Sequence, residues 1–374
     1  MSELEVQPVQ SRRQKKRFLD FPWRLYRDDP LWVPPLRGEE ADLVGFCLHP
    51  FYQAAESQAF LALRGGEVCG RIAAIDNPVH NEAHGEKRGF FGFFECRDDR
   101  QVAAALLRAA RDWLAARGLR QLRGPTNPSI NYTIGTLVEG FDRAPVFLMP
   151  YNPAYYGPLL EACGLRKTQD LYAYHGDVEM LPTIRVKTDP LAEQINRRYG
   201  IRYRTLDRSR FVEDVEQFLS IFNRSLVGHW GFVPPSPAEV KYLARGLSWL
   251  LVPELAVGAE IDGELVGVAF VLPDYNPRIK KIRGRLFPFG FIRLLAGRRR
   301  IKSYRLVAAN VLPAYQLHGV GLGLMGALLS EGLGRNPREV EFSWVAESNA
   351  LSRGALEKGG ARRYKTYRVY DQEL

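Results

Sequence analysis

The chain has 374 residues, 46% hydrophobic and 25% charged, with a formal net charge of +10. This length suits two domains of ordinary size, and the composition is that of a folded globular protein. No apolar run approaches the roughly 20 residues of a membrane span, and no apolar stretch with a cleavage site follows the basic N-terminal residues, so we expect neither a membrane helix nor a signal peptide. The positive charge favours anionic partners, namely nucleic acid, an anionic membrane or a phosphate-rich cofactor.

The cysteine pattern indicates in which cellular compartment the protein works and whether it carries disulfides or a metal. The four cysteines are Cys47, Cys69, Cys96 and Cys163. None belongs to a CxxC pair, and no cluster of histidine and cysteine has zinc spacing. We therefore expect a cytoplasmic protein with no disulfide framework and no metal.

The first half of the chain is expected to hold an N-terminal arm, residues 1–50, and an α/β domain, residues 51–181. A hairpin is predicted around Gly66–Gly70, because β-rich runs flank a glycine that can supply a positive φ. A long, alanine-rich helix follows at Arg100–Arg117, with a strand at Leu119–Arg123.

The second half repeats this pattern. Two pairs of segments match at nearly the same separation: Gly66–Gly70 with Gly263–Gly267, and Leu160–Leu165 with Leu356–Ala361. Self-similarity at one fixed separation indicates an internal duplication. We therefore predict a connection at residues 182–200 and a second α/β domain at residues 201–374, with a long helix at Gly319–Gly334 and a strand at Glu339–Val345.

The second copy carries a basic insertion between its hairpin and its third strand. In Arg278–Arg300, aromatic and aliphatic residues are flanked by cations on both sides. This pattern is typical of an amphipathic element on the surface of an anionic membrane, and we expect a protein that is peripheral on the inner face of the membrane. Two alternatives stay open: an insertion that covers the core with solvated charges, and a nucleic-acid patch.

The loop before the second long helix differs most between the copies. In the run from Gln316 to Gly326, four glycines fall within eight residues, although glycine inside a helix costs about 1 kcal/mol relative to alanine. Such a turn lets backbone N–H groups approach an anion, and the helix N-terminus adds a partial positive charge. The first copy has Asp98 and Asp99 here, which would repel a pyrophosphate. The alternative is a glycine-rich helix packed tightly against a strand.

The motif Gln316-x-x-Gly319-x-Gly321 resembles the Q/R-x-x-G-x-G/A motif of the GNAT superfamily of acyl-CoA N-acyltransferases. The segment Asn349–Gly360 is similar to the later N-x-x-A/S…E-K-x-G-F segment. The resemblance implies tandem GNAT-like domains with a degenerate N-terminal copy, each a mixed twisted sheet flanked by helices. It implies acyl-coenzyme A as the acyl donor, with the pyrophosphate on the first motif and the pantetheine along the preceding strand.

The same resemblance implies a set of cofactor-binding residues. They are Asn310, Val311, Leu312, Gln316, His318, Gly319, Val320, Gly321, Leu322, Asn349 and Ser352. One position departs from the superfamily, since a tyrosine general acid often follows the asparagine by seven residues and this chain has Leu356 there. Because a thiol has a pKa of about 8.5, the coenzyme A thiolate is still a tolerable leaving group.

An amine acceptor must lose a proton before it attacks a thioester, so a base is wanted near the thioester. Glu347, just past a predicted strand, and His229 are the two candidates. Each has a plain alternative, a solvated loop carboxylate for Glu347 and a structural histidine beside a tryptophan for His229. Five residues are candidates for acceptor binding, although a turn or core packing would also explain several of them: Trp230, Asp274, Asn276, Tyr367 and Tyr370.

Four segments narrow the resemblance to the YghO-like family, which includes bacterial ceramide synthases. They are Phe21–Leu36, His229–Pro234, Pro273–Asn276 and Tyr367–Tyr370. The family implies N-acylation of a sphingoid-type long-chain amine by a fatty acyl-CoA. Two other functions stay open, an aminoacyl-tRNA-dependent transferase and a non-catalytic acyl-CoA or lipid-binding module. The intact glycine loop argues against the tRNA reading, so we expect a small-molecule or lipid amine as partner rather than nucleic acid.

Overall fold

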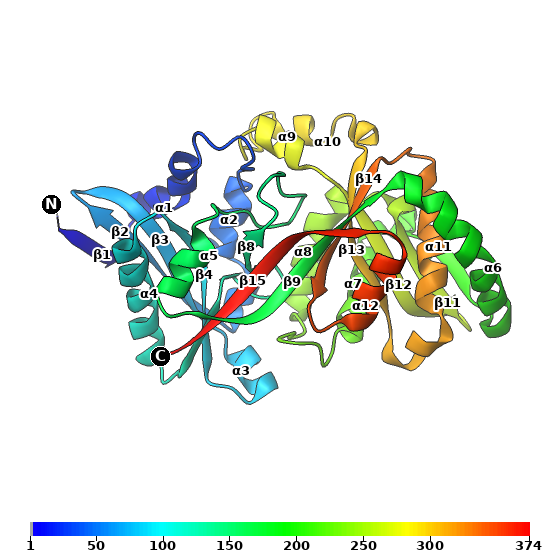
Figure 1. Ribbon diagram of the computed structural model, residues 1–374, viewed down its shortest axis with the longest axis horizontal. Helices are drawn as coiled ribbons and strands as arrows, with labels where there is room; N and C mark the ends of the chain where they lie inside the picture. Colours follow the sequence, from blue (N-terminus) through cyan, green and yellow to red (C-terminus); the bar gives the residue numbers. More distant parts are fainter. Residues whose placement is uncertain (1–2) are drawn as a thin grey trace. The chain divides into compact units, whose positions relative to one another are not determined.

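The computed structural model describes residues 3–374, without the side chains of residues 181–184, 186–188 and 333. The chain forms two compact units (Figure 1). Unit 1 contains Met1–Leu171, Asn276–Arg293 and Lys365–Leu374, and unit 2 contains Tyr172–Tyr275 and Leu294–Tyr364. Each unit is therefore assembled from segments that lie far apart in the sequence.

Unit 1 is built on a mixed sheet with the strand order β1-β2-β3-β4-β5-β15-β9. The strands are β1 (Leu4–Pro8), β2 (Glu56–Arg64), β3 (Glu67–Asp76), β4 (Arg88–Cys96), β5 (Gln121–Gly124), β15 (Arg362–Glu373) and β9 (Arg166–Asp177), and the short β8 (Thr136–Glu139) also pairs with β15. A separate two-stranded sheet consists of β6 (Thr126–Asn127) and β7 (Thr133–Ile134). The predicted hairpin is β2–β3, which turns at Gly65 and Gly66, both with positive φ. The end of the chain completes this sheet, because β15 pairs antiparallel with β5.

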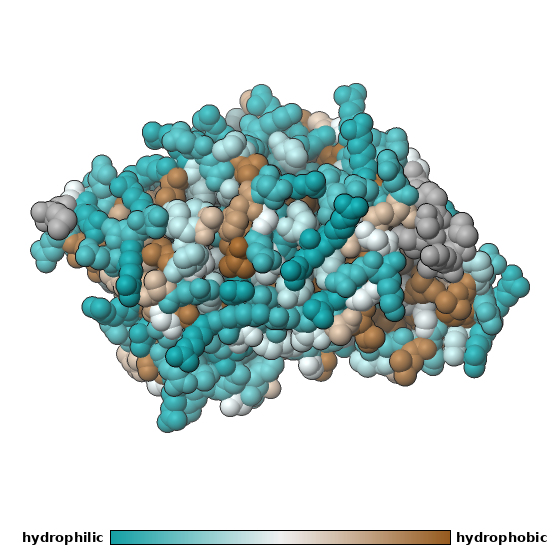
Figure 2. Space-filling view, in the orientation of Figure 1, coloured by the Kyte–Doolittle hydropathy of each residue, from teal (hydrophilic) through white to brown (hydrophobic). Residues whose placement is uncertain are grey.

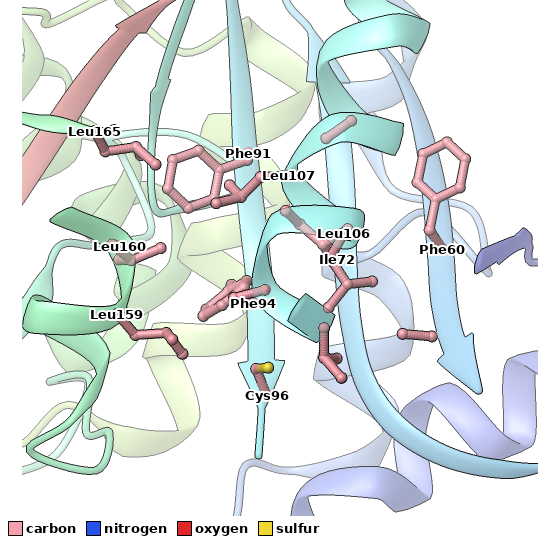
Figure 3. Close-up of a cluster of buried hydrophobic side chains, with 14 of the residues drawn as sticks. Phe60, Ile72, Phe91, Phe94, Cys96, Leu106, Leu107, Leu159, Leu160 and Leu165 are labelled. Atoms are coloured by element: carbon pink, nitrogen blue, oxygen red, sulfur yellow. The ribbon is translucent and has the colours of Figure 1, made fainter. Parts of the chain in front are cut away.

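Helix α4 carries the core of unit 1. The predicted helix Arg100–Arg117 is observed as α4 (Arg100–Ala115), whose buried side chains recur at helical spacing from Val102 to Leu114. They pack with side chains of the sheet and of helix α5 (Figure 3). The other helices of unit 1 are α1 (Arg12–Leu25), α2 (Arg37–Leu43), η1 (Pro50–Gln53), α3 (Pro78–His84), α5 (Tyr156–Ala162) and α9 (Asn276–Lys281).

Unit 2 has a second mixed sheet with the strand order β9-β14-β13-β12-β11-β10. Its strands besides β9 are β10 (Arg202–Thr205), β11 (Ala256–Ile261), β12 (Glu264–Pro273), β13 (Ser303–Val311) and β14 (Glu339–Ala346). The predicted second hairpin is β11–β12, which turns at Asp262 and Gly263, again both with positive φ. The α/β architecture predicted from the sequence is therefore confirmed.

Helices cover both faces of the unit 2 sheet. Val257 and Ala259 of β11 pack in one cluster with Val320 and Leu324 of α11. The alternate residue Ala256 lines a small apolar cavity on the other face with side chains of α7 and α8. The helices of unit 2 are η2 (Val178–Met180), α6 (Leu181–Tyr199), η3 (Arg208–Arg210), α7 (Phe211–Ser225), α8 (Pro237–Leu250), η4 (Pro253–Leu255), η5 (Arg298–Arg300), η6 (Pro313–His318), α11 (Val320–Leu333) and α12 (Ala350–Lys358).

The basic insertion packs on the N-terminal arm within unit 1. The backbone N–H of Arg37 donates to the Gly284 carbonyl over 3.0 Å, and Lys280 Nζ donates to the Pro30 carbonyl. Ile279 and Ile282, which belong to the insertion, are buried. It contains α9 and leads into α10 (Gly290–Leu295). The insertion therefore packs apolar side chains of its own into unit 1, which agrees with the alternative of a core-covering insertion.

The face drawn in Figure 2 is dominated by hydrophilic side chains, with small apolar patches among them. Over the described part of the chain, no helix combines the length and the apolar composition that crossing a membrane requires. Among the same residues, no group of three or more His, Cys, Asp or Glu side chains is arranged to hold a metal ion.

Candidate functional site

The glycine loop links β13 to α11 in unit 2. The 3₁₀ helix η6 carries Gln316, whose Nε2 donates to the Val311 carbonyl over 3.2 Å and so ties the loop to the strand end. Gly319 precedes α11 with a φ of 71°, a left-handed conformation that favours glycine. Within the described residues, no side chain caps this helix N-terminus. The first backbone N–H groups of α11 thus carry partial positive charge that suits an anion.

The glycines of the loop and helix serve different purposes. A Cβ at Gly319 would lie 2.5 Å from Ile195 Cδ1, and one at Gly323 would lie 1.7 Å from Tyr203 Oη. A Cβ at Gly321 would meet its nearest neighbour, Val311 Cγ2, only at 3.9 Å. Tight packing therefore explains Gly319 and Gly323, as the sequence alternative proposed, but it does not explain Gly321. Packing leaves Gly326 unexplained as well, but of the two only Gly321 lies in the first turn of α11, where an anion would bind.

Other predicted loop residues are partly used in packing. The ring of His318 stacks on that of Tyr199, with centroids 4.5 Å apart, and its Nδ1 is buried without a hydrogen-bond partner among the described residues. Val320, the first residue of α11, is fully buried, so its backbone N–H rather than its side chain would serve a ligand. Leu322 is half-buried, and its N–H donates to the Gly319 carbonyl over 3.0 Å.

Strands β13 and β14 separate next to this loop. Their parallel pairing runs from Ser303–Glu339 to Leu306–Phe342, after which β13 continues to Val311 and β14 to Ala346. On its other side β13 stays paired with β12, through Asn310–Val268 and Val311–Gly267. The predicted residues Asn310, Val311 and Leu312 therefore lie beyond the last β13–β14 pair, where an extended ligand could take the place of a strand.

The second motif forms the start of α12. Asn349 Oδ1 accepts a hydrogen bond from the Ser352 N–H over 3.0 Å, so this pair caps the helix. The cap fixes the turn that follows β14. This turn also carries Glu347, which is half-buried. The asparagine side chain thus has a structural task that the sequence motif alone does not reveal.

The remaining unit 2 candidates lie on two other loops. His229 is exposed in the turn between α7 and α8, with its Nδ1 3.1 Å from the Leu226 carbonyl, and Trp230 beside it is half-buried. Asp274 follows β12, and its N–H donates to the Ser303 carbonyl over 2.9 Å. The structure places Glu347, His229 and Asp274 in one unit but on separate loops.

Three predicted acceptor residues are buried in unit 1. Asn276 Nδ2 donates to the Pro145 carbonyl over 2.7 Å. Tyr367 and Tyr370 are fully buried on β15, and because they are three residues apart they point to opposite faces of the strand. Tyr370 belongs to the core under α4, and its Oη donates to Glu161 Oε1 over 3.2 Å. Burial raises the pKa of the Tyr370 phenol above its ordinary range. Core packing accounts for both tyrosines.

A polar cluster in unit 2 was missed by the sequence reasoning. It joins Arg305, Glu341, Ser343 and Tyr364 through hydrogen bonds at the end of the β13–β14 pairing. A signal was present, because Glu339, Glu341 and Ser343 alternate along a predicted strand and would share one face. The partners of this face come from β13 and β15, which are distant in the sequence.

Two curated proteins resemble the chain along nearly its whole length. Bacterial ceramide synthase from Caulobacter vibrioides (strain NA1000 / CB15N) is 38% identical over 384 residues, which cover 100% of this chain and 98% of the relative. Protein YghO from Escherichia coli (strain K12) is 33% identical over 368 residues, which cover 96% of this chain and 93% of the relative. No model of a known protein family matches the chain.

Solved structures share the fold at low sequence identity. A tandem GNAT protein from the clavulanic acid biosynthesis pathway has a TM-score of 0.56 at 15% identity, over 99% of this chain and 98% of that chain. A GCN5-related N-acetyltransferase from Sphaerobacter thermophilus has a TM-score of 0.54 at 12% identity, over 99% and 95%. These likenesses confirm the tandem GNAT fold that the two sequence motifs predict.

Proposed function

This chain belongs to the family of tandem GNAT acyltransferases that includes bacterial ceramide synthase and YghO, and from this premise we propose that it transfers a fatty acyl group from acyl-CoA to a sphingoid-type long-chain amine at a membrane surface. The observation that carries the proposal is the uncapped N-terminus of α11 beside the point where β13 and β14 separate. The name of the ceramide synthase relative supports the choice of acceptor.

The site in unit 2 offers a place for each part of the donor. The N–H groups around Gly319 and Gly321 would hold the pyrophosphate. The free side of β13 at Asn310 and Val311 would pair with the pantetheine, which would bring the thioester between the two strands. The acceptor nitrogen then attacks the thioester carbonyl, the C–N bond forms, and the sulfur leaves with the C–S electron pair.

The site also needs a group that accepts the proton of the amine. An alkyl amine has a pKa of about 10, so a base must take its proton near neutral pH. Glu347, in the turn after β14, is our first candidate for this base, and the exposed His229 is the second.

The insertion on unit 1 supplies the membrane contact in this proposal. Phe287, Phe289 and Ile292 are 87%, 66% and 63% exposed, and together we call them the apolar patch. Exposed cations surround it in the sequence: Lys280, Lys281, Arg283, Arg285 and Arg293. Apolar side chains within a cationic frame complement an anionic bilayer, where each cation adds about 1 kcal/mol. Membrane binding would deliver a lipid amine to the enzyme.

Titration calorimetry on the full chain separates the candidate functions. We expect heat on adding a long-chain acyl-CoA and none on adding tRNA, and we expect release of free thiol together with an amide product when a sphingoid amine is present. A response to tRNA alone would favour the aminoacyl-tRNA-dependent transferase. Acyl-CoA binding without turnover on any long-chain amine would leave a binding module.

Vesicle sedimentation tests the membrane contact separately. We expect the chain to bind vesicles of phosphatidylcholine and phosphatidylglycerol and to remain in solution with phosphatidylcholine alone. A double variant, Phe287→Ser with Phe289→Ser, should lose most of this binding, since it removes exposed apolar side chains and leaves every cation in place. Equal sedimentation of variant and wild type would contradict the assignment of the apolar patch.

A further inference from the structure

The polar cluster in unit 2 is almost completely buried. Arg305 is 3% exposed and Glu341 is 2% exposed. Arg305 Nε donates to Ser343 Oγ over 2.8 Å, Ser343 Oγ donates to Glu341 Oε1 over 2.6 Å, and Tyr364 Oη donates to Glu341 Oε2. Each carboxylate oxygen of Glu341 thus accepts a hydrogen bond, and Ser343 links that carboxylate to the guanidinium.

The cluster lies on the face of the sheet opposite α11. Tyr304 and Leu306 of β13 pack in the core under α11, so Arg305 between them points to the other face. Glu341 is the direct partner of Arg305 in the parallel pairing, and Ser343 is the first residue of β14 after the last pair. A ligand that passed from the N-terminus of α11 between β13 and β14 would therefore reach this cluster.

Stability alone is a weak reason for such a cluster. Removing a carboxylate and a guanidinium from water costs several kcal/mol each, and apolar residues of similar volume are often at least as stabilising. Buried ionisable groups with specific partners are enriched at functional sites. Here the one member of the cluster that is half-buried rather than buried is Tyr364, a phenol on β15. Its ring contacts His175, with centroids 5.8 Å apart, and His175 Nε2 lies 3.0 Å from Glu339 Oε2.

We propose that Tyr364 relays the proton of the acceptor amine, with Glu341 as the positioning residue that receives the phenol proton. The bound ammonium passes one proton to Tyr364 Oη while the Tyr364 hydroxyl proton passes to Glu341 Oε2, and the neutral amine then attacks the thioester carbon. The C–S bond breaks, a second nitrogen proton passes to the leaving thiolate, and the first proton returns from Glu341 through Tyr364 to water. The relay rests on the proposed acyl transfer, and it supplies a tyrosine hydroxyl although the usual motif position holds Leu356.

The test compares Tyr364→Phe and Glu341→Gln with the matched control Tyr174→Phe. Tyr174 also donates to a glutamate in unit 2, with its Oη 2.9 Å from Glu357 Oε1, but it packs in a separate cluster with α12. We expect kcat to fall about 100-fold or more in Tyr364→Phe and Glu341→Gln, because general acid–base catalysis contributes at least that factor. KM for acyl-CoA should stay within about threefold, and the control should keep wild-type kcat.

The pH dependence separates a relay from a structural role. Without the relay, only amine that is already neutral in solution reacts, so kcat/KM of Tyr364→Phe for the amine should rise about tenfold per pH unit below the amine pKa. The wild type should show a shallower profile over the same range. A Ser343→Ala variant, which breaks the link between Arg305 and Glu341 but leaves Tyr364 intact, gives a second measurement if Tyr364→Phe folds poorly. It should lower kcat about tenfold and leave acyl-CoA binding unchanged.

The possible failures are distinguishable. If the wild type transfers acyl groups and Tyr364→Phe matches its kcat and its pH profile, the relay is wrong and the proposed function stands. Wild-type kcat in a well-folded Ser343→Ala together with Glu341→Gln would also overturn the relay. If the wild type binds acyl-CoA but releases no thiol with any long-chain amine, both proposals fail together.

Discussion

Helices α4 in unit 1 and α11 in unit 2 follow equivalent strands but begin in opposite ways. The side chain of Asp99 caps α4 and accepts hydrogen bonds from the N–H groups of Gln101 and Val102. Helix α11 begins at Gly319, with no side-chain cap among the described residues. The first turn of a helix always has N–H groups that need an acceptor. Unit 1 supplies that acceptor from its own chain, and unit 2 leaves the task to water or a ligand.

The strands next to these helices differ in the same sense. In unit 1 the β4–β5 pairing ends at Phe90–Arg123, and the following β6 fills the gap. The Asn127 side chain accepts from the Phe93 N–H over 2.6 Å, and a Cβ at Gly92 would lie only 1.8 Å from the Thr126 carbonyl oxygen. In unit 2 the chain passes from β14 through a short turn into α12. In unit 1, residues of β6 thus occupy the space beyond the last β4–β5 pair. In unit 2, the chain turns into α12 after β14 and supplies no such strand among the described residues.

The largest expected effect separates the two helix starts directly. A Gly321→Glu change puts a carboxylate at the N-terminus of α11, where it would repel a pyrophosphate and occupy its space. Because a Cβ at this position meets no atom closer than 3.9 Å, the fold should be unaffected. We expect calorimetry to show acyl-CoA binding weakened by about 100-fold or more, with an unchanged melting temperature.

Gly326→Glu is the matched control for this change. It introduces the same charge five residues, or about one and a half turns, later on the same helix, at a position where a Cβ would have no neighbour within 4 Å. Acyl-CoA affinity should stay within about threefold of wild type, since the effect of the helix dipole is confined to the first turn. Wild-type affinity in Gly321→Glu would mean that the anion site is not at the start of α11.

The second prediction tests the glycine that packing explains. A Gly323→Ala change drives a methyl group against Tyr203 Oη, which is itself held by a hydrogen bond to Asn196. We expect a loss of about 1–3 kcal/mol in the free energy of unfolding, measured by urea denaturation. Gly326→Ala should instead stabilise by up to about 1 kcal/mol, since it only improves helix propensity. Equal effects at the two positions would contradict this division of the glycines.

Local sequence patterns predicted much of this fold. The glycine turns placed both hairpins, and the long helices begin within a residue of their expected starts, at Arg100 and Val320. The position of β15 was not predictable, because β15 pairs with β5 across more than half the chain. Hydrophobic periodicity shows which residues share a face of a strand, but not which distant strand lies beside it.

In the candidate site, too, local features could be predicted from the sequence, whereas contacts between distant segments could not. The Gln316–Gly321 loop could be found because its glycines conflict with helix propensity over a short stretch. Tyr370, a candidate for acceptor binding, packs in the core of unit 1, and the sequence could not decide between the two roles because a buried core tyrosine and a pocket tyrosine give the same local pattern. The Arg305–Tyr364 cluster was missed because its members come from β13, β14 and β15, and only the folded chain brings them together.

The third prediction concerns the space beside β4 of unit 1 that β6 occupies. Asn127→Ala removes the acceptor of the Phe93 N–H, and an unsatisfied buried donor costs roughly 1–2 kcal/mol. Urea denaturation should show this loss, and acyl-CoA affinity should not change, because β6 still occupies the gap. A second acyl-CoA site in the variant would mean that this one side chain separates the two units in function.

The smallest effect tests whether the cap alone keeps unit 1 from binding an anion. Asp99→Ala should lower the free energy of unfolding by about 1 kcal/mol, and Asp99→Asn by less, because asparagine also caps helices well. In the Gly321→Glu background, neither change should restore acyl-CoA binding, since the gap beside β4 stays filled by Thr126 and Asn127. Restored binding would show that the aspartate cap, and not the filled gap, makes the two units different.

The pH dependence of this difference has a definite sign. Burial raises the Asp99 pKa. The hydrogen bonds from Arg64 and from the N–H groups of Val102 and Gln101 together lower it by more, so the net pKa lies below its ordinary value of 3.8. A depressed folded-state pKa contributes stability that is complete above the unfolded value and is lost as pH falls through the folded value. The stability gap between wild type and Asp99→Ala should therefore be constant near neutral pH and shrink only below about pH 4. A gap that shrank above pH 5 would show that another titrating group, and not this cap, distinguishes the start of α4 from that of α11.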